Sequence, residues 1–263
     1  MLASIFVKDI RDQRRGLVGW GVGIVVLVGM MAAIWPSFRN MPDLDEFLAN
    51  YPEAMRELFN IEAITTGTGY LNAELFSIIL PAMFLLFAIG RGARAIAGEE
   101  QDGTLEILLV TPLSRLHVLA EKTGALVLSV VGLGLVLFLA SWGFAVAFDF
   151  DIAVVELAGA ATAMVLLGLA HGLVALAIGA STGRRSWALA GAGMLALAGY
   201  VLYIVAKLVD AIEPWQVLSP FYHALEGGPI GGGFPTNFLW LILIGLIAFA
   251  VCLMPFDRRD IRI

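Results

Sequence analysis

Charged residues are scarce in this chain, and cysteine and histidine are nearly absent. Only 14% of its 263 residues are Asp, Glu, Lys or Arg, whereas 60% are hydrophobic; soluble domains carry about 25% charged residues. A single cysteine excludes a disulfide-stapled fold, and a net charge of −6 argues against a nucleic-acid partner. A soluble globule of this size could not bury so much apolar surface. The composition therefore predicts an all-α polytopic membrane protein.

Recognisable catalytic and metal-binding patterns are also missing. No Gly-Lys pair occurs in the sequence, and a phosphate-binding P-loop needs G-x-x-x-x-G-K-[ST]. The three histidines, His117, His171 and His223, are expected at an inner interface, within a span and in an outer loop. They would lie too far apart to share a metal ion. We therefore expect no catalytic residue, no metal site and no cofactor in this chain.

Six long windows without charge are each able to cross a bilayer, which needs about 20 mostly apolar residues. A charge at the centre of a span costs about 3 kcal/mol, so six such windows are not expected by chance. We expect a single transmembrane domain over residues 1–263. Its spans are predicted at about 17–35, 75–97, 118–148, 152–180, 187–207 and 237–256.

The basic residues are distributed unevenly between the two sides of the predicted spans. Thirteen of the sixteen Lys and Arg fall on the side that holds both termini. Only Arg39, Arg56 and Lys207 fall on the other side. Because basic connections stay in the cytoplasm, we expect both termini there. The expected location is a bacterial or archaeal plasma membrane.

The first fifteen residues are apolar on one helical face and charged on the rest. This pattern is typical of a helix lying in the membrane interface. A frayed tail with ordinary flanking charges is the alternative. We expect an interfacial helix over residues 1–15, separate from the first span.

Residues 213–235 form an unusual connection before the last span. The segment mixes prolines, clustered glycines and aromatic residues. It is too apolar for a plain solvent loop and too often broken for a span. Irregular backbone at membrane depth must be shielded by protein or face water. We expect a re-entrant stretch near the outer leaflet, with a Gly-rich surface loop carrying an aromatic belt as the alternative.

The connection at 98–117, between the second and third spans, has the order of a short capped helix. An acidic turn precedes Gly103, which breaks the chain, and the hydroxyl of Thr104 suits an N-cap. Glu106 favours the positive start of the helix. Pro112 ends the helix, and Ser114 can then cap the third span. The predicted product is a helix of about two turns.

This short helix has an apolar face, formed by Leu105, Leu108 and Leu109. Nothing else in the chain is expected to bury that face. It suits docking into a groove of a cytoplasmic partner, and it suits equally a helix that lies flat on the inner leaflet.

The run G-E-E-x-x-G-T-L-E-x-L-L-x-T-P-L-S-R resembles the signature of the ABC type-2 permease family, the membrane subunits of ATP-driven transporters. The specific match is confined to about residues 99–115. The resemblance implies that the 98–117 connection is a coupling helix that docks into a separate ATPase subunit, which would carry ATP and Mg. It further implies two permease chains, identical or different, and two ATPase chains. The expected coupling residues are Glu99, Glu100, Gly103, Thr104, Leu105, Glu106, Leu108, Leu109, Thr111, Pro112 and Arg115.

His171 is the ionisable residue expected in the middle of the fourth span. An ionisable group at that depth indicates a functional role, although a neutral imidazole bonded to a neighbouring helix explains it as well. Gly168 and Gly172 flank it at the spacing that permits close helix approach. These three residues are candidates for a transport pathway or a helix contact.

The leading hypothesis is a permease subunit of an ATP-driven transporter that exports an amphipathic or hydrophobic substrate. One alternative within the family is a permease dedicated to maturation of a secreted metalloenzyme or to export of a lipid-linked polymer. Another, from a different class, is a membrane anchor or sensor that transports nothing.

Overall fold

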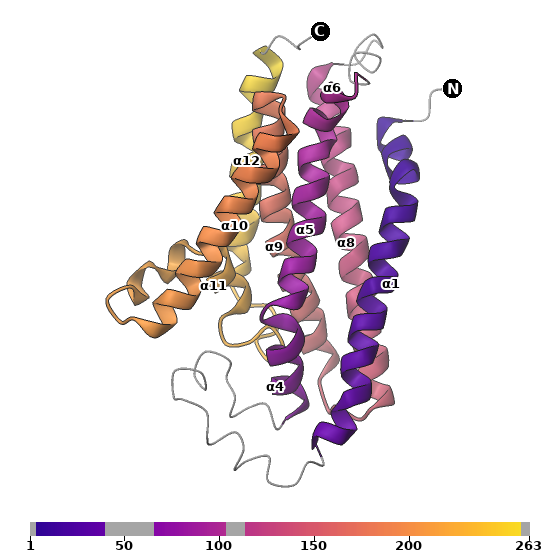
Figure 1. Cartoon of the computed structure of the whole chain (residues 1–263), viewed down its shortest axis with the longest axis vertical. Helices are drawn as coiled ribbons and strands as arrows, with labels where there is room; N and C mark the ends of the chain where they lie inside the picture. Colours follow the sequence, from indigo (N-terminus) through magenta and orange to yellow (C-terminus); the bar gives the residue numbers. More distant parts are fainter. Residues whose placement is uncertain (1–3, 40–65, 104–113, 259–263) are drawn as a thin grey trace.

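The computed structural model describes residues 4–39, 66–103 and 114–258, which form an elongated bundle of helices (Figure 1). No strand occurs among these residues. Within these described ranges, five helices are long and apolar enough to cross a membrane, and the last helix has a shorter apolar part, Phe238–Leu253. The chain is therefore an all-α, multi-pass membrane protein, as the composition predicted. The principal helices are α1 (Ile5–Arg39), α5 (Ile79–Ala93), α8 (Arg115–Ala147), α9 (Val154–Thr182), α10 (Arg185–Leu208) and α12 (Phe238–Arg258).

The first helix differs from the expectation of a separate interfacial segment over residues 1–15. Residues from Ile5 onward continue without interruption into the first span, and α1 is 35 residues long. Two contacts with α8 explain the continuity. Asp9 forms an ion pair with Lys122, and the backbone N–H of Phe6 donates to Glu121 Oε2 at 3.0 Å. A helix turned into the membrane plane would lose both partners.

The second span belongs to a longer helical run with two π-helical turns. Thr66 caps the run because its hydroxyl accepts from Gly69 N at 3.1 Å. The run begins with α4 (Gly67–Leu71) and a π-turn, η2 (Asn72–Phe76), and ends beyond α5 with η3 (Arg94–Gly98) and α6 (Glu99–Gln101). We call the two ends of the bundle the α4 end and the α6 end. The N-terminal end of α1 lies at the α6 end (Figure 1).

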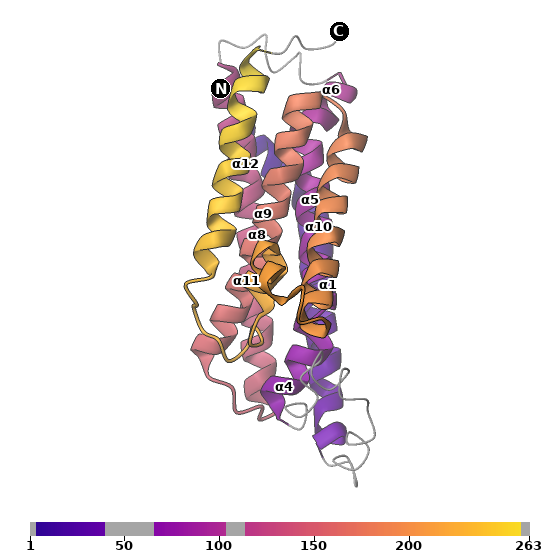
Figure 2. The ribbon, with the colours of Figure 1, turned by 90° about the vertical axis from the view of Figure 1, so that its left-hand side faces the viewer.

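Helix α9 is the centre of the bundle and packs against α5, α8, α10 and α12 (Figure 2). Its buried face is rich in alanine and glycine. Helix α5 approaches it closely at Gly92, where an added Cβ would lie 2.0 Å from the carbonyl oxygen of Gly172. Small residues let two helix backbones come this near, and in lipid such packing is the main force between helices.

The stretch at 213–235 folds back against the bundle. A 3₁₀ turn, η4 (Glu213–Leu218), leads into the short helix α11 (Pro220–Leu225), which packs against α9, α10 and α12 (Figure 2). Ser219 caps α11, and its hydroxyl also donates to the carbonyl of Gly199 in α10 at 2.7 Å. Helix α11 is therefore largely buried in protein, whereas η4 has no buried residue and leaves Trp215, Val217 and Leu218 exposed.

The glycine-rich half of the same stretch is fastened to the start of the second span. Asn72 Nδ2 donates to the carbonyl of Ile230 at 2.9 Å, and the N–H of Ile230 donates back to Asn72 Oδ1 at 3.0 Å. Gly228 has φ +83°, and an added Cβ there would lie 2.7 Å from the Asn72 amide. Glycine at this position permits both the left-handed turn and the close amide contact.

We predict that Gly92→Ala lowers the stability of the bundle. The new methyl would meet the α9 backbone, which cannot rotate aside, so the expected cost is about 1–3 kcal/mol. Thermal unfolding of the purified chain in detergent measures the effect. Gly90→Ala is the matched control in the same helix, because a Cβ there meets nothing within 4 Å. Equal midpoints for the two variants would contradict the close packing of α5 on α9.

Candidate functional site

The centre of the predicted coupling connection lies outside the described residues. This part holds seven of the predicted coupling residues: Thr104, Leu105, Glu106, Leu108, Leu109, Thr111 and Pro112. The structure does describe both ends of the connection. Glu99, Glu100 and Gly103 lie where it leaves the second span, and Arg115 lies where the third span begins.

The chain leaves the second span through α6, which continues the π-turn η3 without a gap. Gly103 ends this helical run with φ +67°, a conformation that residues with a Cβ rarely adopt, and its N–H donates to the carbonyl of Glu100 at 3.2 Å. Asp102 lies 3.9 Å from Arg94, but both side chains are exposed, so this pair contributes little to stability. The glycine therefore fixes where the helix stops.

The chain enters the third span at a capped helix start. The hydroxyl of Ser114 accepts a hydrogen bond from His117 N at 3.2 Å, as the sequence predicted. Arg115 is the first residue of α8. Such a cap satisfies one of the backbone donors that every helix start leaves without an intrahelical partner. Both ends of the connection are thus fixed by local structure.

A buried cluster of three charges joins the connection to two spans. Lys122 of α8 is only 1% exposed. Its Nζ donates to Asp9 Oδ1 of α1 at 2.6 Å and also to Glu99 Oε1 of α6. We call these three residues the Lys122 cluster. It links the first residue of α6 to the first and third spans at the α6 end of the bundle.

The two carboxylates of this cluster depend on Lys122, which is their shared cation. A buried charge whose partner is removed is strongly destabilising, by about 3–5 kcal/mol, because it loses both water and its counter-charge. The carboxylates of Asp9 and Glu99 are largely withdrawn from solvent, at 11% and 17% side-chain exposure. The cluster therefore holds α6 in one place relative to α1 and α8.

The sequence pattern indicated a coupling role for Glu99. It gave no separate role to Asp9 or Lys122, which were two of the charges near the ends of the predicted spans. One signal was present in the sequence. Lys122 lies two turns inside a helix that is otherwise almost free of charge after Glu121. A lysine so placed needs a partner.

An open cleft of about 540 Å³ lies between α1 and α5 beside the Lys122 cluster. Its lining includes Trp20 and Phe87, whose rings meet edge to face with centroids 5.8 Å apart. Arg91, Arg94 and, from α10, Arg185 line the cleft nearer the α6 end. Charged and apolar surfaces are therefore both present in one cleft.

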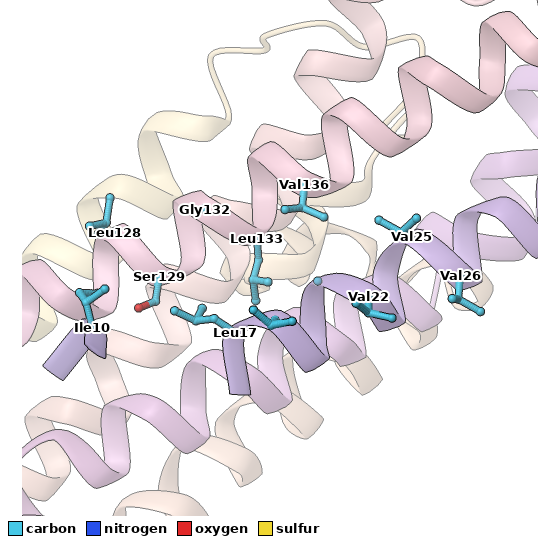
Figure 3. A pocket seen from close by; sticks show the side chains of 12 residues that line it. Ile10, Leu17, Val22, Val25, Val26, Leu128, Ser129, Gly132, Leu133 and Val136 are labelled. Carbon is cyan, nitrogen blue, oxygen red and sulfur yellow. The ribbon is translucent and has the colours of Figure 1, made fainter. Parts of the chain in front are cut away.

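A second groove, between α1 and α8, is almost entirely aliphatic (Figure 3). Its volume is about 500 Å³, and valines and leucines from both helices line it. The hydroxyl of its one polar side chain, Ser129, donates to the carbonyl of Ala125 at 2.7 Å. Since that hydroxyl is already engaged, the groove offers little to orient a polar ligand.

His171, Gly168 and Gly172 lie in the middle of α9. His171 is 4% exposed, with Nδ1 at 3.0 Å from the carbonyl of Leu167 and its ring centroid 5.9 Å from that of Phe221 in α11. The imidazole is thus bonded to a carbonyl of its own helix. The structural alternative considered for His171 had predicted a bond to a neighbouring helix. Both glycines face α5. A role for these residues in a transport pathway stays a prediction.

A family model described as "ABC-2 family transporter protein" matches residues 3–261, which is nearly the whole chain. The chain belongs to the ABC-2 transporter family. No curated protein matches it. Membership of this family makes the chain a membrane permease component of an ABC transporter, distinct from the ATPase, and associates it with an ABC ATPase. The resemblance seen in the 98–115 run is therefore confirmed.

We predict that Lys122→Met destabilises the permease by about 3–5 kcal/mol, because two buried carboxylates would lose their shared cation. Thermal unfolding in detergent measures the loss. Lys8→Met is the control, since Lys8 is an exposed lysine near the same end. Neutralising the cluster with Asp9→Asn and Glu99→Gln in the Lys122→Met background should restore most of the stability. A triple variant as unstable as Lys122→Met would show that charge pairing is not the cause.

Proposed function

We propose that this permease is the membrane subunit of an ATP-driven exporter, coupled to separate ATPase subunits through the 98–117 connection. The observation that most supports this proposal is the Lys122 cluster, which joins the start of that connection to two spans. The sequence has no Gly-Lys pair and therefore no P-loop, which supports ATP hydrolysis by another polypeptide. ATP and Mg would be bound by that partner.

In the proposed mechanism, the connection transmits motion from the ATPase subunits to the spans. When ATP closes two ATPase chains together, the connection moves with them. Through Glu99 the motion reaches Lys122 in α8 and Asp9 in α1, so two spans shift with the end of the second. ATP binding thereby biases a two-state element and changes the side to which a central pathway opens.

The proposed assembly contains two permease chains and two ATPase chains in a bacterial or archaeal plasma membrane. The distribution of Lys and Arg supports placing both termini, and with them the α6 end, in the cytoplasm. The permease chains can be identical or different. The apolar surfaces of the bundle support an amphipathic or hydrophobic substrate.

The central test is whether the connection engages the ATPase. Leu105→Asp and Glu106→Lys should abolish capture of the partner ATPase and stimulation of its hydrolysis, while membrane insertion is unchanged. Co-purification with the ATPase, followed by an ATPase assay in proteoliposomes, measures both effects. Val7→Asp is the control for Leu105→Asp, because Val7 is an exposed apolar residue of α1 near the same end.

Undiminished capture and stimulation by the connection variants would remove the coupling proposal. Capture of the ATPase by the unaltered chain discriminates a transporter from a membrane anchor or sensor. Transport of a soluble or lipid substrate by the reconstituted complex, with no further protein, would discriminate a general exporter from a dedicated maturation system.

A further inference from the structure

We propose that the cleft between α1 and α5 is a binding site for an anionic lipid, with the acidic headgroup at Arg91 and the start of the acyl chain over Trp20 and Phe87. This site goes beyond the proposed transport function. It requires only that the cleft lie in the bilayer, whatever the ATPase does.

The shape of the cleft comes from two facing stripes of residues. On α1, Lys8, Asp12, Gly16 and Trp20 follow one another at intervals of four, so they share one helix face. The facing wall on α5 includes Gly90. A Cβ at Gly16 or Gly90 would meet nothing within 4 Å. The middle of the cleft is therefore open because both walls lack side chains there.

The charge in the cleft favours an anion near Arg91. Asp9 and Glu99 share the single charge of Lys122 and also attract Arg91, but the three arginines of the lining outnumber this one excess negative charge and that of Asp102. Arg91 is half-buried, and no acceptor among the described residues bonds its buried Nε. Arg94 makes a long contact of 3.9 Å with Asp102, and Arg185 adds a third guanidinium to the lining. A planar guanidinium binds phosphate or carboxylate oxygens through two parallel hydrogen bonds.

The remaining charges of the lining stand at the outer rim. Lys8 and Asp12 are both exposed and of opposite sign, so they cancel at first approximation and are screened by water. The depth of the cleft is thus divided into a charged zone at the α6 end and an apolar zone further along the helices. That order of polarity matches a lipid headgroup followed by its chain.

The apolar zone argues for a lipid against a free anion. Leu17, Trp20, Leu86 and Phe87 line it, and Leu86 is 68% exposed at the rim. A soluble phosphate would satisfy Arg91 but leave this surface in contact with water or unfilled. An acyl chain covers it and continues along the outside of α5. The cleft volume of about 540 Å³ lies in the range of known ligand sites.

The experiment uses the full-length chain in nanodiscs and a phosphatidylglycerol with a photoreactive group in its acyl chain. A phosphatidylcholine with the same group is the neutral probe. Crosslinked peptides are mapped by mass spectrometry. We expect the anionic probe to label α1 and α5 peptides around Trp20 and Phe87 in preference to the neutral probe.

Two variants test the two halves of the site. Arg91→Gln should reduce labelling by the anionic probe about tenfold, because it removes a charge-assisted contact, and Arg91→Lys should retain part of it. Gly90→Leu should block the cleft for both probes. The matched controls are Arg14→Gln and Gly19→Leu, which alter exposed positions of α1 outside the cleft. Thermal midpoints establish that each variant is folded.

Equal labelling by the two probes, or full labelling of folded Arg91→Gln, would overturn the proposal. Loss of lipid labelling in an excess of inorganic phosphate would also overturn it, because the site would then bind a soluble anion. Selective labelling with no capture of an ATPase would leave the lipid site standing and remove the proposed function. Capture of an ATPase without selective lipid labelling would leave the proposed function standing and remove the lipid site.

Discussion

The α6 end of the bundle depends on one buried lysine. Lys122 brings Asp9 of α1 and Glu99 of α6 onto a single cation that is 1% exposed. Removing Lys122 would leave two largely buried carboxylates without a cation. The upright course of α1 and the fixed position of α6 both follow from this constraint. The cleft beside α5 borders the same cluster.

The other end of the bundle is held together differently. Trp35 of α1 stacks on Phe150, with ring centroids 5.2 Å apart, and also contacts Tyr70 of α4. The amide of Asn72 fastens the second span to Ile230 beyond α11. This end also has an ion pair, between Lys207 and Glu226 at 3.6 Å, but both side chains are partly exposed, whereas the ion pairs of the α6 end are formed on a lysine that is 1% exposed. The α6 end is therefore better suited than the α4 end to respond to a charged partner.

Much of the fold was predictable because a charge inside a membrane span is costly, so the spans coincide with stretches of sequence that lack charge. Helix α9 covers 154–182 where a span over 152–180 was expected, and α10 covers 185–208 in place of 187–207. The family was recognisable because the 98–115 run is local in sequence. The cap at Ser114 was predictable for the same reason.

Features that depend on distant contacts were not predictable. The charged face of residues 5–15 is typical of an interfacial helix, but the pairing of Asp9 with Lys122 spans 113 positions of sequence. The sequence indicated Gly172 as a candidate helix contact, but it did not show that the partner is Gly92 of α5, because many glycines in apolar runs offer similar spacings. Amphipathic patterns show which face is polar, but the partner on that face comes only from the fold.

We propose that the Lys122 cluster transmits force between the ATPase and the spans. The most direct measurement is the permease-stimulated ATPase rate of the neutral variant that combines Asp9→Asn, Glu99→Gln and Lys122→Met. We expect this variant still to capture the ATPase but no longer to stimulate hydrolysis, because the connection after Glu99 is unchanged whereas the ion pairs that join Glu99 to α1 and α8 are lost. Stimulation equal to that of the unaltered chain would contradict it.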